Sequence, residues 1–266
     1  MLKTFIKSIL KNFGLLGVAD RLRFLVIYIK TYKAQQLFKQ QHPTVALPPP
    51  YFIYETHKLN YQSYYEQSID SAKWLVSFLS KYASLNGLSI LDWGCGPGRI
   101  IRHLPDLTAN SCRYFASDYN GKYINWCTKN IHGVDFVKND LKPPLPYSSD
   151  TFDIIYGMSI FTHLSEKLHF EWFEELMRVM KKGGILFLTL HGEVFLSKLT
   201  EKEKIRFRAG QLTVQSSAME GHRTFSAYQP DDFMMKLIGK NELVVHEKGI
   251  VAERKPQQDV WIIRKS

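Results

Sequence analysis

The stretch "SILDWGCGPGRIIRHL", residues 89–104, combines a short apolar run, three alternating glycines and a helical pattern. Glycine has no Cβ, so the chain can turn sharply here and its backbone can approach a ligand closely. A helix that begins beneath such a turn presents its free N–H groups to that ligand. The stretch therefore predicts a strand, a ligand-binding turn and a helix.

The residues around the glycines indicate the kind of ligand. A dinucleotide-binding loop has the pattern GxGxxG, but the third glycine position is occupied here by Arg99. Asp118 ends the next predicted strand, where an acidic residue can accept both ribose hydroxyls of an adenosine group. The pattern therefore favours an adenosine-containing cofactor that is not a dinucleotide.

Strands and helices alternate from Leu88 onward. Strands are predicted at residues 88–93, 112–118, 134–140, 152–158 and 183–192, with a helix at about 166–180 and a final strand pair at 242–253 and 259–266. Alternation of this kind predicts an α/β fold with a doubly wound, mostly parallel sheet. The return between the last two strands is too short for a helix, which predicts that they pair antiparallel.

These blocks, in this order, resemble the class I S-adenosylmethionine-dependent methyltransferases over about residues 88–192. The resemblance rests on GxGxG preceded by Asp92, on Asp118, on "VKNDLKPPLPYSSDTFDIIYGMSIFTHL" and on "RVMKKGGILFLTLHG". It implies a Rossmann-like seven-stranded sheet with helices on both faces and a reversed last strand. It also implies S-adenosylmethionine as the cofactor.

The resemblance places the cofactor on a defined set of residues. Asp92 would position the methionine end through the turn, Gly94 and Gly96 would lie against the ribose and amino-acid portions, and Asp118 would bind the ribose. The expected cofactor-binding set is Asp92, Gly94, Cys95, Gly96, Asp118, Tyr119, Asn139, Asp140, Leu141 and Met158. The alternative is that Asp118 only caps its strand and that Asn139 and Asp140 are ordinary loop residues. Cys95 is interpreted as a small filler, because no activating base is apparent.

The reaction expected is methyl transfer to an acceptor hydroxyl by in-line displacement. Such transfer requires alignment of the nucleophile, exclusion of water and removal of a proton, for which histidine is the natural base. The candidates are His163 after the 152–158 strand, His191 at the end of the 183–192 strand and His222 in the following segment. His163 could instead fix the loop or the cofactor. No metal ligands are expected.

Several motifs restrict the acceptor. The chain has "YGMS" at the end of its fourth strand in place of the (D/N)PP(Y/F) motif of amino-methylating DNA enzymes, and it lacks a Pro-Cys dipeptide. "PPPYF", "SDYN", "TLHGE" and "SAYQP" add a similarity to a bacterial subgroup that often accompanies glycosyltransferases in surface-polysaccharide loci. This similarity implies a sugar or glycan hydroxyl, or another small acceptor. A lipid, quinone-like or amine acceptor and a non-catalytic cofactor-binding scaffold are the alternatives.

The N-terminal region differs in charge from the rest. Of a formal net charge of +10, most lies in residues 1–41, which contain eight basic residues and one acidic residue, Asp20. We expect one or two basic amphipathic helices there, broken near 14–17, and a proline-rich connector up to residue 50, with the methyltransferase domain at 51–266. The helices would contact a membrane surface or pack on protein. A nearly neutral body argues against nucleic acid as a partner.

The cysteines and the longest apolar run of the N-terminal region bear on the cellular compartment. The three cysteines, Cys95, Cys112 and Cys127, form no CxxC pair, and we expect a reducing, cytoplasmic setting, with peripheral contact at the inner membrane surface. The apolar run at residues 24–29 is too short to cross a membrane, and no secretory signal is expected. The sequence does not indicate an oligomeric state.

Overall fold

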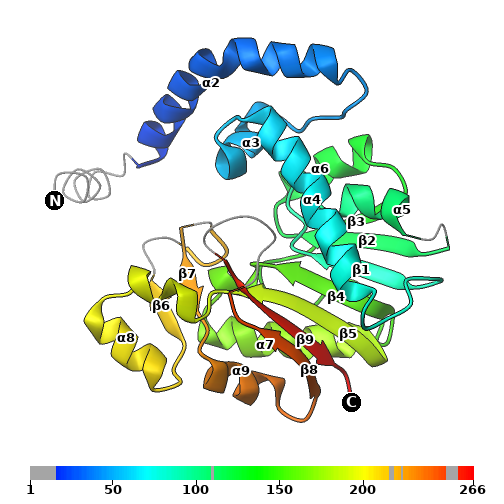
Figure 1. Cartoon of the computed structure of the whole chain (residues 1–266), viewed down its shortest axis with the longest axis vertical. Helices are drawn as coiled ribbons and strands as arrows, with labels where there is room; N and C mark the ends of the chain where they lie inside the picture. Colours follow the sequence, from blue (N-terminus) through cyan, green and yellow to red (C-terminus); the bar gives the residue numbers. More distant parts are fainter. Residues whose placement is uncertain (1–15, 109–110, 216–218, 223, 250–256) are drawn as a thin grey trace. The chain divides into compact units, whose positions relative to one another are not determined.

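The computed structural model describes residues 16–108, 111–215, 219–222, 224–249 and 257–266 (Figure 1). Packing divides the chain into two units, Met1–Ile69 and Asp70–Ser266, which meet inside helix α4, Tyr61–Leu79. This division falls later than residue 51, where the sequence predicts the start of the methyltransferase domain. Each unit is described by itself.

The first unit contains helix α2, Leu16–Gln41, helix α3, Pro50–His57, and the beginning of α4. Proline at the first position of α3 suits a helix start, since its φ is already helical and no N–H is lost from the ladder. A small aromatic-rich core joins the three helices and contains Phe38, Ile53, Tyr54, Leu59, Tyr61 and Tyr64.

Helix α2 differs from the expected amphipathic helix. It runs unbroken from Leu16 to Gln41, and its apolar residues lie on two opposite faces, one packed in the small core and the other exposed. Helix α2 is therefore apolar on two faces rather than on one. The helix expected before residue 14 lies outside the described residues. Over the described part of the chain, no helix has the length and apolar character needed to span a membrane.

The second unit is built on a seven-stranded sheet in the order β3-β2-β1-β4-β5-β9-β8. The strands are β1, Ser89–Trp93; β2, Arg113–Asp118; β3, Val134–Lys138; β4, Phe152–Met158; β5, Met180–Leu190; β8, Glu242–Glu247; and β9, Asp259–Arg264. The last strand along the chain, β9, is antiparallel to both neighbours, and the first five strands are parallel. The predicted Rossmann-like sheet with a reversed last strand is confirmed.

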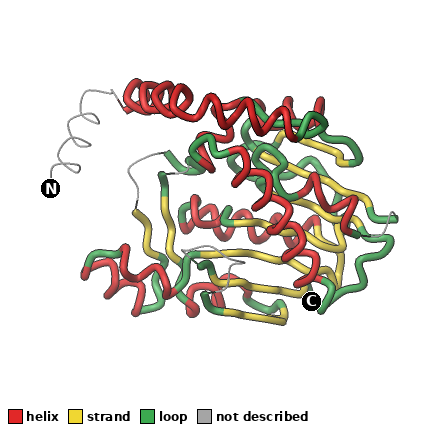
Figure 2. The backbone as a smooth tube through the Cα atoms, turned by 45° about the horizontal axis from the view of Figure 1, so that its top comes forward, coloured by secondary structure: helices red, strands yellow, loops and turns green. Residues whose placement is uncertain are grey.

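Two apolar layers cover the sheet, because successive residues of a strand point to opposite faces. On β1, Leu91 and Trp93 belong to one layer with α7, Glu166–Val179, and α9, Asp231–Ile238. Ile90 belongs to the other, with the second half of α4, the short helices η1, Ile101–His103, and α5, Leu104–Leu107, and helix α6, Gly121–Asn130. Figure 2 shows helices on both sides of the strands.

An insertion follows β5 before the chain returns to the sheet at β8. It contains the short helix η3, Glu193–Lys198, helix α8, Glu201–Arg208, and a small hairpin of β6, Thr213–Gln215, and β7, Ser226–Tyr228. The sequence did not predict this hairpin, since each strand has only three residues. The hairpin contacts η2, Phe161–His163, so it supports the loop after β4.

Candidate functional site

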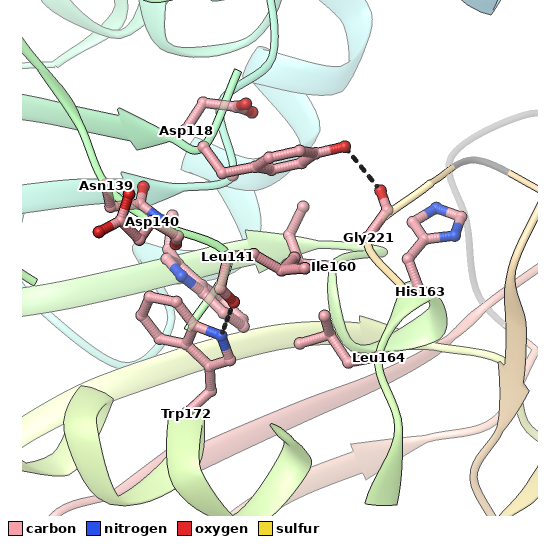
Figure 3. Close-up of a pocket in the computed structure, with 12 residues that line it drawn as sticks. Asp118, Asn139, Asp140, Leu141, Ile160, His163, Leu164, Trp172 and Gly221 are labelled. Carbon is pink, nitrogen blue, oxygen red and sulfur yellow. Dashed lines mark hydrogen bonds between the residues drawn. The ribbon is translucent and has the colours of Figure 1, made fainter. Parts of the chain in front are cut away.

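A pocket lies at the carboxyl ends of the central strands, where the chain order of the sheet reverses between β1 and β4. Ligands of open α/β sheets bind at this kind of switch point. The lining residues follow β1, β2, β3 and β4 in turn and are completed by α7 and the insertion: Trp93, Gly94, Asp118, Tyr119, Asn139, Asp140, Leu141, Ile160, His163, Leu164, Trp172 and Gly221 (Figure 3).

Asp118 ties the glycine loop to the neighbouring strand. Its Oδ2 accepts a hydrogen bond of 2.8 Å from the Gly96 amide, and its Oδ1 accepts one of 2.8 Å from the Asn120 amide. Burial raises the pKa of Asp118, and these two amides oppose that rise. Each carboxylate oxygen can accept more than one hydrogen bond, so the group retains capacity for hydroxyls of a ligand.

Glycine is favoured at positions 94 and 96 of the loop for reasons that differ in part. Gly94 and Gly96 both have positive φ, at 78° and 54°, which favours glycine. A Cβ on Gly94 would lie 2.3 Å from Cδ1 of Ile160, so any side chain would push into the pocket wall. A Cβ on Gly96 would meet nothing within 4 Å, so the space beside it is open.

The part of the pocket around Leu141 and Trp172 is mostly apolar, and one buried acceptor beside it has no partner. The indole N–H of Trp172 donates a 2.9 Å hydrogen bond to the Leu141 carbonyl, which fixes the ring against the loop after β3 (Figure 3). The side-chain amide of Asn139 donates to the Asp140 carbonyl at 2.6 Å, and its buried Oδ1 has no partner. A buried unpaired acceptor is uncommon and suits a ligand that brings a donor.

Four of the expected cofactor-binding residues do not line this pocket. Asp92, Cys95, Gly96 and Met158 lie at the ends of β1 and β4 or in the glycine loop, and the lining contains their neighbours instead. Burial raises the pKa of Asp92 to about 7, and nearby Asp118 adds to this. Burial also holds the pKa of the Cys95 thiol well above its ordinary value, which agrees with a filler rather than a nucleophile.

The structure places His163 near both His191 and His222 but puts only His163 in the pocket lining. Its Nδ1 lies 2.8 Å from the Phe225 carbonyl, just before β7. Nδ1 of His191 lies 3.1 Å from the Ala227 carbonyl on β7. A carbonyl can only accept, so each Nδ1 carries the proton and each neutral ring has its lone pair on Nε2. The hairpin thus fixes the tautomer of both imidazoles and leaves Nε2 of each ring unprotonated.

The surroundings of the three rings differ. Burial lowers the pKa of His163, with nearby His222 adding to the effect, and burial lowers the pKa of His191 to about 4. The His191 ring packs against Phe195, with ring centroids 4.1 Å apart. His222 is exposed, and its Nδ1 lies 2.9 Å from the Thr224 hydroxyl. His163 therefore combines access to the pocket with a lone pair that stays unprotonated at neutral pH.

Gln229 joins the histidine-bearing segments beneath the pocket. The side chain is 1% exposed; its Oε1 accepts from the His191 amide at 3.1 Å and its Nε2 donates to the Phe161 carbonyl at 3.2 Å. The same Nε2 lies 3.1 Å from Nε2 of His169, whose Nδ1 donates to the Ser165 carbonyl. One side-chain amide therefore connects the end of β5 to η2 and α7.

Among the described residues, one group has the composition of a metal site: Asp231, His246 and Asp259. Nε2 of His246 lies 3.2 Å from Asp259 and 3.8 Å from Asp231, and the Lys248 ammonium lies 2.8 Å from the other oxygen of Asp231. The Gly249 amide donates to Asp259 at 2.9 Å. With the carboxylates paired in this way, we interpret the group as an ion-pair network that joins α9, β8 and β9.

The pocket residues fit S-adenosylmethionine. The carboxylate of Asp118, the orphaned Oδ1 of Asn139 and the open space at Gly96 suit a ligand with hydroxyl and amino groups, and Leu141 and Trp172 suit an apolar ring. Trp93, Ile160, Leu164, Trp172 and Gly221 also line the pocket and were not predicted. The strand-end positions of Trp93 and Ile160 were a usable signal, whereas Trp172 and Gly221 come from distant segments.

Comparison with known proteins agrees with this geometry. Residues 90–184 match the family model described as a methyltransferase domain. Among solved structures, a magnesium protoporphyrin IX methyltransferase from Synechocystis with bound S-adenosylhomocysteine aligns over 98% of this chain and 100% of its own, at 16% identity and a TM-score of 0.54. A SAM-dependent methyltransferase from Methanosarcina mazei aligns over 71% of this chain and 96% of its own, at 19% identity and a TM-score of 0.55.

The curated relatives match this chain over only part of their own length. A tRNA N(3)-methylcytidine methyltransferase of Schizosaccharomyces pombe is 25% identical over 65% of this chain and 58% of its own length. A tRNA (carboxymethyluridine(34)-5-O)-methyltransferase of Arabidopsis thaliana is 32% identical over 45% of this chain and 28% of its own. The chain thus spans less than two thirds of these relatives.

The second unit therefore has the Rossmann-like sheet of the solved methyltransferases that it resembles, and residues 90–184 within it match the methyltransferase-domain model. The pocket residues fit S-adenosylmethionine, and the Synechocystis structure holds S-adenosylhomocysteine.

Proposed function

We propose that this protein transfers a methyl group from S-adenosylmethionine to a hydroxyl of a small acceptor, with a sugar or glycan as the leading acceptor and His163 as the general base. The observation that carries the proposal is that His163 lines the same pocket as Asp118 and Asn139, with its Nδ1 turned to a backbone carbonyl. Asp118, Asn139, Leu141 and Gly94 would hold the cofactor.

When bound, S-adenosylmethionine supplies a methyl group on a positively charged sulfur, which is a good leaving group. With the donor held by Asp118, Asn139, Leu141 and Gly94, the acceptor oxygen would bond to the methyl carbon as the carbon–sulfur bond breaks, and S-adenosylhomocysteine would be released. Nε2 of His163 would take the hydroxyl proton, which is a typical contribution of a positioned base. Because burial lowers the pKa of His163, its lone pair is available at pH 7, and activity should fall only at a pH below its ordinary range.

A hydroxyl acceptor is supported by the presence of His163 in the pocket lining and by the names of relatives. The Arabidopsis relative is a 5-O-methyltransferase, and a malonyl-[acyl-carrier protein] O-methyltransferase of Enterobacter lignolyticus is 28% identical over 38% of this chain and 38% of its own length. Two relatives act on tRNA by name, so tRNA belongs in an acceptor screen although the charge distribution argues against it. Lipid, quinone-like and amine acceptors complete the alternatives.

The first test is calorimetric binding of S-adenosylhomocysteine, since a protein that does not bind it cannot carry out this reaction. The second is transfer of a labelled methyl group to a panel of glycans, lipid-linked glycans, quinols, amines and unmodified tRNA. Binding without transfer to any acceptor or cell extract would favour a non-catalytic scaffold. Transfer to tRNA, or to an amine, would overturn the acceptor class.

The base is tested with His163→Asn and the matched variant His222→Asn. We expect His163→Asn to lower the turnover by roughly 100-fold or more, with S-adenosylhomocysteine affinity unchanged, because a positioned base contributes about 10²–10⁴-fold. The turnover of His222→Asn should stay within about threefold of the unchanged protein, which is small beside the contribution of a positioned base. A large loss in His191→Asn alone would reassign the role.

The cellular setting is also part of the proposal. The free, buried cysteines Cys95, Cys112 and Cys127 support a reducing compartment, and we propose a cytoplasmic enzyme. Contact of residues 1–41 with the inner membrane surface would bring the enzyme to a lipid-linked acceptor.

A further inference from the structure

Helix α2 presents a second apolar face that nothing in its own unit covers. The inner face contributes Phe24, Ile27, Tyr28 and Phe38 to the small core of the first unit. The other apolar residues recur at helical spacing along one exposed face, and each is 48% to 74% exposed: Val18, Leu22, Leu25, Val26, Ile29 and Tyr32. Soluble proteins rarely expose an apolar row of this length. Large exposed apolar patches mark interaction sites.

Basic residues border this face. At 100° per residue, Arg21 lies on one side of the row, Arg23 and Lys30 lie on the other, and Lys33 lies within it, all of them exposed. Long basic side chains can keep their charge at a headgroup level while their methylene groups follow the apolar surface.

The acidic side of the helix is turned away from this face. Asp20 is the single acidic residue of residues 1–41, and its carboxylate accepts hydrogen bonds of 2.8 Å from Tyr51 and 2.9 Å from Tyr54 of α3. The exposed face therefore carries positive charge alone.

We propose that the outer face of α2, residues 18–33, docks on an anionic lipid surface. Apolar residues would enter the headgroup boundary, and Arg21, Arg23, Lys30 and Lys33 would contact lipid phosphates, as interfacial helices do. A second copy of the chain fits poorly, because pairing two such faces would bring like charges together. The helix lies in the surface rather than across it, in agreement with the lack of a described helix able to span a membrane.

This inference deepens the membrane part of the proposed function and does not depend on methyl transfer. The test is co-sedimentation of the full chain with vesicles of phosphatidylcholine alone or mixed with phosphatidylglycerol. We expect binding to the mixed vesicles that weakens as salt rises. Each basic residue near an anionic surface contributes about fivefold in partition, so Arg21→Gln with Lys30→Gln should weaken binding about 25-fold.

The apolar part is tested with Leu22→Glu combined with Ile29→Glu, which should weaken partition by more than about tenfold. Ile205→Glu and Lys240→Gln change exposed residues of the same kinds in the second unit and should bind as the unchanged protein does. Circular dichroism and S-adenosylhomocysteine affinity, unchanged in every variant, show that the loss is not misfolding and separate this result from failure of the methyltransferase proposal.

Three outcomes would overturn the inference. One is equal binding to vesicles with and without phosphatidylglycerol, and a second is unchanged binding by the Leu22→Glu/Ile29→Glu variant. The third is a concentration-dependent dimer, seen by analytical ultracentrifugation, that this variant abolishes, since that would assign the face to a second copy.

Discussion

Replacement of Gln229 by leucine is the most direct test of the network beneath the pocket. Its side-chain amide makes three hydrogen bonds, to the His191 amide at 3.1 Å, the Phe161 carbonyl at 3.2 Å and the His169 ring at 3.1 Å. Leucine has a similar size and makes none of them. Since Gln229 is 1% exposed, water cannot replace the lost partners.

The expected loss of unfolding free energy follows from the number of hydrogen bonds removed. A buried hydrogen bond contributes about 1 kcal/mol net, so three of them give about 3 kcal/mol, with more if the stranded groups stay dry. This is a large part of the stability of an ordinary domain, which is about 5–15 kcal/mol. Urea unfolding should therefore show a midpoint lowered by about 1 M or more for Gln229→Leu.

Two further variants make the experiment decisive. Gln229→Met keeps an unbranched side chain and should lose about as much as leucine, because the loss arises from hydrogen bonding rather than shape. Gln211→Leu replaces an exposed glutamine of the same insertion and should change the unfolding free energy by less than about 0.5 kcal/mol. A loss below about 1 kcal/mol in Gln229→Leu would refute the reasoning, since it is less than one third of the sum of three bonds.

Three other changes have defined outcomes. Asp118→Asn should weaken S-adenosylhomocysteine binding by about 10-fold to 100-fold in calorimetry, as expected for one lost bond to a charged acceptor, whereas Asp135→Asn on the neighbouring strand should not; equal affinities would exclude Asp118 as a ligand. Gly192→Ala would place a Cβ 1.9 Å from Oδ2 of Asp259 and should lower the melting temperature; an unchanged temperature contradicts this packing. Burial raises the pKa of Asp92 in the folded state from 3.8 to about 7, so the folded protein loses stability as the pH rises through that window. The Asp92→Asn variant should therefore be more stable than the unchanged protein at pH 8 and should lose that advantage toward pH 5. A gain in stability that does not depend on pH would contradict the assignment.

Much of the fold follows from local pattern. Short apolar runs that alternate with helical periods predicted the parallel strands, and a return too short for a helix predicted the antiparallel end of the sheet. Even so, the hairpin of β6 and β7 was not predicted, because three-residue strands carry almost no periodic signal. The two apolar faces of α2 were not predicted either, since which face is covered depends on α3 and α4.

The sequence by itself determined which strand-end residues meet at the pocket edge of the sheet. In a parallel sheet the carboxyl ends of neighbouring strands meet at one edge, so residues such as Gly94, Asp118 and Asn139 must converge once the strands are known. Only the tertiary structure decided which histidine has access to that pocket. His163 and His191 follow strands in the same way, and their difference arises because η2 brings one ring into the pocket lining, while packing against Phe195 covers the other. Long-range packing of this kind is set by the whole core and has no local signature.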